Sequence, residues 1–254
     1  MTKFITDRRF WLIPIFAFSL LTLISTYWNL ENLNRMAEQL AYERAQSMFK
    51  LVEMTRLWNA RHGGVYVPVT DESPSNPYLE VPDKDITTTT GRRLTKLNPA
   101  YMTRQIADIA REFGNIHFHI TSLNPINPNN LPDQWESFAL SLLEINTKEV
   151  LEYRERDDEA VYRYMGPLIT KKSCMKCHEK QGYVVGDIRG GISITLPAAP
   201  ILDAQSATRD QIIVIHLILF TLIIGMTLFY LNKMQQQWIL LSNTQNKVKK
   251  PESI

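Results

Sequence analysis

Two long apolar segments constrain this chain most strongly, because segments of this kind are buried in a membrane or a large core. The first, FWLIPIFAFSLLTLISTYW at residues 10–28, contains no charged residue, and about 20 apolar residues are enough to cross a bilayer. The second is apolar from Ile212 to Leu231 except for His216. We predict transmembrane helices at residues 10–28 and 211–231. A cleaved signal peptide is the alternative for the first, but no small-x-small cleavage site follows it.

Basic residues flank both apolar segments on their outer sides: Lys3, Arg8, Arg9, Lys233, Lys247, Lys249 and Lys250. The positive-inside rule then predicts that both ends of the chain lie in the cytoplasm. Residues 1–9 form a cytoplasmic N-terminus, residues 232–254 a short cytoplasmic tail, and residues 29–210 the periplasmic domain of an inner-membrane protein. The tail is too small for an output domain. The net charge of +2 gives no reason to expect a nucleic acid partner.

A long amphipathic helix is predicted to continue out of the first apolar segment, from Leu30 to Asn59. Apolar residues recur there at spacings of three to four: Leu30, Leu33, Met36 or Ala37, Leu40, Met48, Leu51 or Val52, and Trp58. The segment has no proline or glycine, and Gly63-Gly64 ends it. We expect this stalk to pack on a core or on the same helix of a second copy, which makes a homodimer a reasonable expectation.

The rest of the outer segment predicts an α+β domain. Two shorter helices are expected after the caps Asn98 and Asp133, the first with Pro99 in its first turn and Gly114 at its end. Strand signals occur in four places: residues 65–67, NIHFHITSL, a hairpin with its turn at Arg156–Glu159, and residues 191–196. We predict two helices on a small antiparallel sheet.

Both cysteines of the chain lie in KKSCMKCHEK. Cys174, Cys177 and His178 form C-x-x-C-H, the attachment signature of a c-type haem. Each thiol adds to one vinyl group of the haem, and the histidine ligates the iron. A zinc site would need four ligands, and no second cysteine pair or histidine cluster is near in sequence. A thioredoxin-type redox pair needs an alternating α/β context, and a short disulfide is a third alternative. We predict one covalent haem c, attached outside the cytoplasm.

The sixth ligand of the iron is open in the sequence. His62, at the end of the predicted stalk, is our first candidate and Met102 our second, and an empty position is the third alternative. His117 and His119 share one face of a strand, where each is more often a core histidine with its hydrogen bonds satisfied. His216 lies in the second apolar segment, where we expect a hydrogen bond between packed helices.

Three further side chains are candidates for contacts with the haem. Arg189, in GDIRGG just after the motif, is predicted to neutralise a propionate through charge-assisted hydrogen bonds. Weaker candidates for the same role are Arg92, Arg93 and Arg104. Trp58 and Tyr66 flank the turn at His62 and are candidates for stacking on the porphyrin. Solvated surface charge and ordinary core packing are the alternatives for all of them.

Several blocks occur in a characteristic order: LWNARHGGVYV, NPYL, NPAYMTRQ, ITSLNPINPNN, WESFAL, YRYMGPL and CMKCHEKQGYVVGDIRGGISI. The segment from Glu38 to Leu196 thereby resembles the PAS-like single-haem c sensor domain of bacterial periplasmic receptors. This resemblance implies a PAS-like fold with a long N-terminal helix, haem at Cys174 and Cys177, and His178 as its ligand. In that family the domain often precedes a histidine kinase or related output module, which this sequence lacks. Some relatives add a cysteine ligand from the upstream helical region, whereas this chain has no third cysteine.

Three functions follow from these features. Our leading prediction is a membrane-anchored haem sensor of redox state or of a small ligand, which passes its signal to a separate partner protein. The alternative is an electron-transfer cytochrome anchored beside a respiratory-chain partner. The third, a peroxidase-like enzyme, lacks a recognisable distal acid–base set. We therefore predict that the protein is not an enzyme.

Overall fold

The structure, a computed structural model, describes residues 7–145, 147–156 and 159–248. The chain divides into two compact units, one of Met1–Met36 with Asp203–Ile254 and one of Ala37–Leu202. Parts of two predictions fall outside the described residues: positions 157 and 158 of the hairpin turn, and Lys3, Lys249 and Lys250 of the charge pattern.

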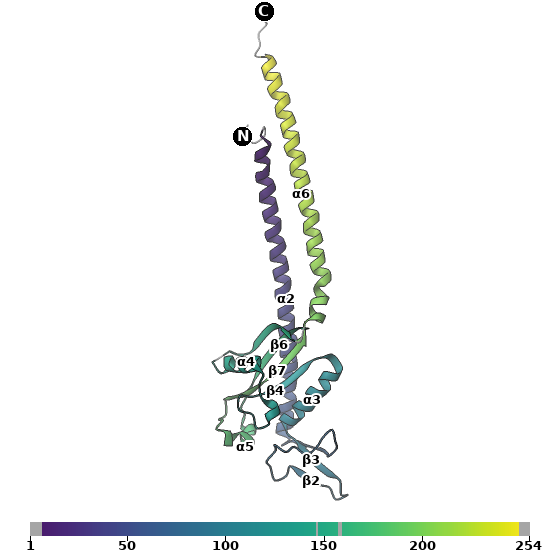
Figure 1. Cartoon of the computed structure of the whole chain (residues 1–254), viewed down its shortest axis with the longest axis vertical. Helices are drawn as coiled ribbons and strands as arrows, with labels where there is room; N and C mark the ends of the chain where they lie inside the picture. The colour runs from purple at the N-terminus through teal and green to yellow at the C-terminus, as the bar shows by residue number, and fades with distance from the viewer. Residues whose placement is uncertain (1–6, 146, 157–158, 249–254) are drawn as a thin grey trace, which may run out of the picture. The chain divides into compact units, whose positions relative to one another are not determined.

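The two apolar segments lie in long helices, labelled α2 and α6 in Figure 1. After the 3-10 turn η1 (Arg8–Trp11), α2 runs from Leu12 to Arg61, and α6 from Ala199 to Val248. Both contain a stretch long and apolar enough to cross a membrane. The predicted hydrogen bond of His216 is present: its Nδ1–H donates to Ile212 O at 2.7 Å, and its Nε2 accepts from the Ser25 hydroxyl at 3.0 Å.

A four-stranded antiparallel sheet of order β4-β7-β6-β5 forms the centre of the second unit (Figure 1). Its strands are β4 (His117–Thr121), β5 (Val150–Arg156), β6 (Glu159–Ile169) and β7 (Ile188–Pro197). The strand signals in NIHFHITSL and in the hairpin are confirmed, and β7 extends beyond the predicted 191–196 at both ends. Side chains of β6 alternate between the faces: Tyr164 joins the core on the α2 side, while Met165 joins the core under α4.

The second half of α2 covers one face of this sheet through a buried stripe of three alanines followed by two larger side chains: Ala37, Ala41, Ala45, Phe49 and Val52. The contact is close, because a Cβ at Gly166 of β6 would lie 2.6 Å from the Phe49 ring. Of the alternatives in the predicted stripe, the structure buries Ala37 and Val52 and exposes Met36 and Leu51. Trp58 is 54% exposed and lies outside the part of the stripe that packs on the sheet. Alanines carry too weak a hydrophobic signal to mark this face in the sequence.

Helix α4 (Gln134–Glu144) covers the other face and begins where predicted. The Asp133 side chain accepts from the Glu136 N–H, and the Glu136 side chain accepts from the Asp133 N–H, which completes a capping box. Four buried residues of this helix pack with Met165: Trp135, Ala139, Leu140 and Leu143. The sheet therefore has a separate core on each face.

The segment between α2 and α3 forms a second, three-stranded sheet of order β1-β3-β2. Its strands are β1 (Val65–Pro68), β2 (Asp85–Thr87) and β3 (Arg93–Leu97), and the sequence predicted only the first. Helix α3 (Pro99–Gly114) follows, with the Asn98 side chain accepting from the Tyr101 N–H as its cap. The prediction of mixed helix and sheet with a long N-terminal helix is thus confirmed.

Candidate functional site

The C-x-x-C-H motif lies on an excursion between the paired strands β6 and β7. Two backbone hydrogen bonds close the base of this excursion: Thr170 N–H to Asp187 O at 2.8 Å, and Gly186 N–H to Thr170 O at 2.9 Å. Inside it the chain forms three short helical turns: η3 (Lys172–Cys174), α5 (Met175–His178) and η4 (Glu179–Gln181). The closed base fixes the motif to the two central strands of the sheet.

Two adjacent cavities receive the side chains of the motif. Cys177 and His178 line a cavity of about 260 Å³. Cys174 lines a smaller cavity of about 50 Å³. Leu168 and Arg189 line both, so they form the partition between them. The wall of the larger cavity also includes residues from β4 and the loop that follows it: Ile120, Thr121, Ser122, Asn124, Ile126, Asn127 and Asn130.

His178 is held in one tautomer by contacts at both ring nitrogens. Its Nδ1–H donates to Gln181 Oε1 at 2.6 Å, and its Nε2 accepts from Arg189 Nη1 at 3.3 Å. Burial, and then the charge of Arg189, lower the pKa of His178 from its usual value. The side chain is therefore a neutral imidazole whose Nε2 carries a lone pair, with its other nitrogen fixed by a hydrogen bond. This is the form in which histidine binds metals in proteins.

The residues of this site fit a covalently attached haem. Both thiols are free and half-buried, with two residues between them, and the histidine follows directly. In the described part of the chain, no group of three or more His, Cys, Asp or Glu side chains could hold a metal ion by itself. A single histidine suits a metal whose other ligands come from a macrocycle. Cys174 and Cys177 would hold the vinyl groups, and His178 the iron.

Of the other predicted residues, Arg189 lines the cavity beside His178, and among the weaker propionate candidates Arg104 does so as well. Six residues predicted to contact or ligate the haem line neither cavity: Trp58, His62, Tyr66, Arg92, Arg93 and Met102. His62 is exposed, and its Nδ1–H donates to the Trp58 carbonyl oxygen at 2.8 Å. The rings of these two residues lie 4.5 Å apart, so they stack on each other. Their roles at a haem stay predictions.

Tyr66 and Met102 have other partners. The Tyr66 hydroxyl donates to the Asp83 carbonyl oxygen, and Lys96 Nζ lies 5.2 Å from the centre of its ring. The Met102 sulfur lies 3.6 Å from Asn59 Nδ2. In this arrangement the structure does not bring either candidate for the sixth ligand, His62 or Met102, to the cavity of His178.

The sequence profile described as Tll0287-like matches residues 34–197, well over half of the chain. The chain belongs to the Tll0287-like family. The crystal structure of the cyanobacterial haem protein Tll0287 is similar to it at 16% sequence identity and a TM-score of 0.42, with 61% of this chain and 94% of that chain covered. Among curated protein sequences, none matches this chain. All residues lining the two cavities lie within the part that matches the Tll0287-like family.

Two residues of the site in this Tll0287-like chain were missed in the sequence. Gln181, which fixes the tautomer of His178, lies three residues after it. Arg56 lines the cavity of Cys174 and is only 5% exposed. A usable signal for Arg56 exists, because it continues the buried stripe of α2 four residues beyond Val52. A charged residue at such a position indicates a polar site inside the domain.

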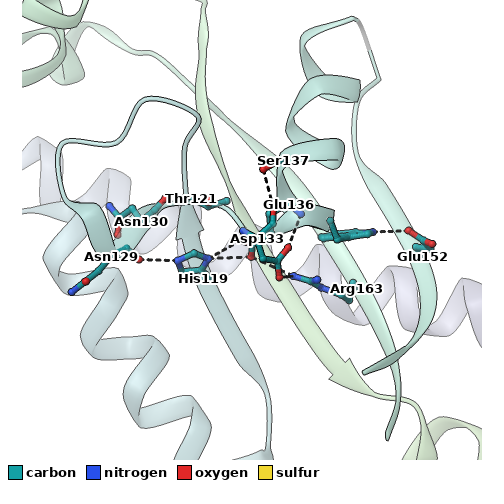
Figure 2. A network of polar contacts seen from close by, with 10 residues as sticks. His119, Thr121, Asn129, Asn130, Asp133, Glu136, Ser137, Glu152 and Arg163 are labelled. Carbon is teal, nitrogen blue, oxygen red and sulfur yellow. Dashed lines mark hydrogen bonds and ion pairs between the residues drawn. The ribbon is translucent and has the colours of Figure 1, made fainter. Parts of the chain in front are cut away.

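His119 does not line the cavity itself but contacts the loop that walls it, and Figure 2 shows these contacts. Its Nδ1 lies 2.9 Å from Glu136 Oε2, and its Nε2 lies 3.0 Å from the Asn129 carbonyl oxygen. Both partners are acceptors, so the imidazolium satisfies both contacts. The hydrogen bond to Glu136 raises the pKa of His119 above its usual value, against the effect of burial. Asn129 belongs to the loop after β4 that walls the cavity.

The same network continues across the sheet to β6 and β5. Arg163 Nη2 lies 2.8 Å from Asp133 Oδ2 and 3.4 Å from Glu136 Oε1, and its guanidinium carbon lies 4.3 Å from the centre of the Trp135 ring. The indole N–H of Trp135 donates to Glu152 Oε2 at 2.6 Å (Figure 2). The cavity wall is thus tied through buried charges to the central strands of the sheet.

Proposed function

We propose that the chain is a haem-binding protein that carries one covalent haem c on Cys174 and Cys177, with His178 as an iron ligand. One observation carries this proposal: the motif presents a neutral imidazole beside a cavity, with both thiols on the same short excursion. Membership of the Tll0287-like family, in which the similar solved structure is a haem protein, supports it.

Each residue of the site has a separate task in this proposal. The two thiols hold the ring, His178 ligates the iron through Nε2 in place of its contact with Arg189 Nη1, and Gln181 keeps the imidazole in the required tautomer. Leu168 and Ile120 give the cavity apolar walls that exclude water. The haem iron would supply one-electron redox chemistry and a coordination position for a small ligand.

We further propose that the protein is a membrane-anchored sensor of redox state or of a small ligand, with a PAS-like main domain in the periplasm and its two apolar helices in the inner membrane. Helix α2 supports this, because one unbroken helix contains both a candidate span and the cavity residues Glu53, Arg56 and Leu57. A change at the cavity therefore acts on a helix that also contains the candidate span. In this scheme the protein is not an enzyme and signals to a separate protein.

A homodimer is part of the same proposal. The side of α2 that faces away from the sheet exposes three large apolar side chains at helical spacing: Leu51, Met54 and Trp58. A second copy of the same helix would cover such a face. Pairing of this kind would give a signal in α2 a route to a second chain.

Electron transfer to a respiratory-chain partner is the second candidate function. Lys176 and Lys180 line the cavity of His178 and are exposed. Lys180 Nζ lies 4.0 Å from Glu80 Oε2, so Lys176 is the residue that places positive charge at the rim. A rim of this kind guides an acidic redox partner by electrostatic attraction. The sensing and electron-transfer proposals share the same haem. A small-ligand sensor needs an exchangeable position on the iron, whereas redox sensing and electron transfer do not.

The test is the visible spectrum of the full-length protein, produced with intact c-type maturation, oxidised and reduced, with and without carbon monoxide. A high-spin reduced form that binds carbon monoxide supports the small-ligand sensor. A sharp low-spin reduced spectrum untouched by carbon monoxide supports redox sensing or electron transfer. The double variant Cys174→Ser, Cys177→Ser is the control and should lose covalent haem. Absence of haem absorbance in the unaltered protein would refute the proposal.

A further inference from the structure

Two arginines meet at the smaller cavity, beside Cys174. Arg56 comes from α2 and Arg189 from β7, and both line this cavity. Arg56 is held firmly, because its Nη1 donates to the Pro99 carbonyl oxygen at 2.9 Å and to Thr103 Oγ1 at 2.7 Å. Its side chain therefore keeps one position without help from any carboxylate.

The charges of these two arginines are not balanced. Within the described residues, neither forms an ion pair with a carboxylate. Glu53 also lines the cavity, but its carboxylate pairs with Lys171 at 2.9 Å. Arg189 Nε is buried and has no hydrogen-bond partner among the described residues. Buried charges in proteins are normally paired, so an anion is missing here.

The electrostatics agree with this shortage of negative charge. Burial, and then the neighbouring charge of Arg189, lower the pKa of Arg56 to about 9. Even so, the guanidinium stays protonated at neutral pH. Two cations therefore face one small cavity, and each would gain from a shared anionic partner.

We propose that Arg56 and Arg189 form a carboxylate-binding site between α2 and β7, in the cavity beside Cys174. The planar guanidinium group matches a carboxylate through paired, charge-assisted hydrogen bonds. Two sources have this chemistry, a haem propionate and a small free carboxylate. If the source is a propionate, the inference rests on the proposed function, and Arg56 then ties the cofactor to the helix that contains a candidate span.

The first experiment uses the full-length chain produced without the haem-attachment machinery, so that the cavity carries no haem. The haem-free chain is titrated with sodium propionate, and with neutral propionamide as the matched probe, by calorimetry. We expect saturable binding of propionate and none of propionamide. Arg56→Gln and Arg189→Gln should each weaken binding about 10- to 100-fold, the loss of a charge-assisted hydrogen bond. Arg44→Gln, at an exposed position of the same helix, should leave binding unchanged.

Arg56→Lys is the second variant, because Arg56→Gln removes two hydrogen bonds to α3 and circular dichroism must show that it folds. Lysine keeps the charge and loses the planar fork, so binding should fall by less than in Arg56→Gln. If Arg56→Gln does not fold, Arg56→Lys and Arg189→Gln decide the question.

The second experiment identifies the source with the haem-loaded chain. A haem propionate at this site would block binding of free propionate. The reduction potential would then change with pH over a higher pH range in Arg56→Gln than in the unaltered chain. The reason is that a carboxylate that loses its cation has a higher pKa. If free propionate still binds the loaded chain through Arg56, the source is a small free carboxylate.

The proposal is overturned if the haem-free chain binds no carboxylate through Arg56 and Arg189 and the pH profile of the loaded chain does not move. This result differs from failure of the proposed function. A chain that takes up no haem during c-type maturation refutes the haem proposal, while the haem-free titration still tests the carboxylate site.

Discussion

Replacing Glu136 by glutamine should loosen the loop that walls the larger cavity, because this buried carboxylate holds it through His119. Glu136 accepts from the Asp133 N–H at 3.0 Å, from His119 Nδ1 at 2.9 Å and from Arg163 Nη2 at 3.4 Å. Glutamine keeps the shape but removes the charge and turns one acceptor oxygen into an NH2 donor. That donor then faces another donor, either His119 or Arg163.

The expected cost follows from the contacts that are lost. A hydrogen bond to a charged group contributes about 1.5–3 kcal/mol, and glutamine loses one or two of the three. The His119 side chain is 36% exposed, so solvent screens part of its interaction. We therefore expect the free energy of unfolding to fall by about 2–4 kcal/mol, which lowers the melting temperature by roughly 4–16 °C in a domain of this size.

The effect should depend on pH in a definite direction. Glu136 raises the pKa of His119 in the folded state above its usual 6.5. The stability gained from this pair is therefore fully present below pH 6.5 and is lost as the pH rises through the folded pKa. The difference between the unaltered protein and Glu136→Gln should shrink over that range. His178 has the opposite pH dependence. Its pKa is lowered in the folded state, so the haem-free chain loses stability as the pH falls below 6.5.

The assay is thermal unfolding of the full-length protein followed by circular dichroism, at a series of pH values from about 6 upward. Glu144→Gln is the matched control, since Glu144 is exposed on the same helix. Groups that face His119 and its partners, Asp133 and Arg163, are unchanged in both variants. Equal melting temperatures for the two variants, or a loss in Glu136→Gln that stays constant with pH, would refute the reasoning.

Two further predictions concern packing and the haem ligand. Gly166→Ala places a Cβ 2.6 Å from the Phe49 ring, so overpacking should lower the free energy of unfolding by about 1–3 kcal/mol. Gly225→Ala is the control, because there is open space around Gly225. Equal melting curves for the two variants would contradict this account. Gln181→Leu removes the acceptor of His178 Nδ1–H, so the imidazole donates less charge to a bound iron and the reduction potential of the loaded chain should rise. An unchanged potential in a redox titration would show that Gln181 does not tune the ligand.

The elements that could be predicted from the sequence are those fixed by local chemistry. Asn98 and Asp133 each cap a helix through side-chain bonds a few residues away, and such bonds depend little on the rest of the fold. The C-x-x-C-H spacing is equally local. Strands β2 and β3 were not predicted. β2 is short and largely exposed, and it is held in place by pairing with β3, which lies further along the chain.

The site as a whole could not be predicted, because its cavities are assembled from segments far apart in sequence. The motif supplies two thiols and an imidazole, but the partners that define their surroundings come from α2, α3, β7 and the loop after β4. Arg56 illustrates the limit: along α2 it is one charged residue among several, and its role appears only where the helix meets Pro99, Thr103 and Arg189. Local spacing is therefore enough to propose the chemistry of attachment, whereas the charge balance around it required the assembled fold.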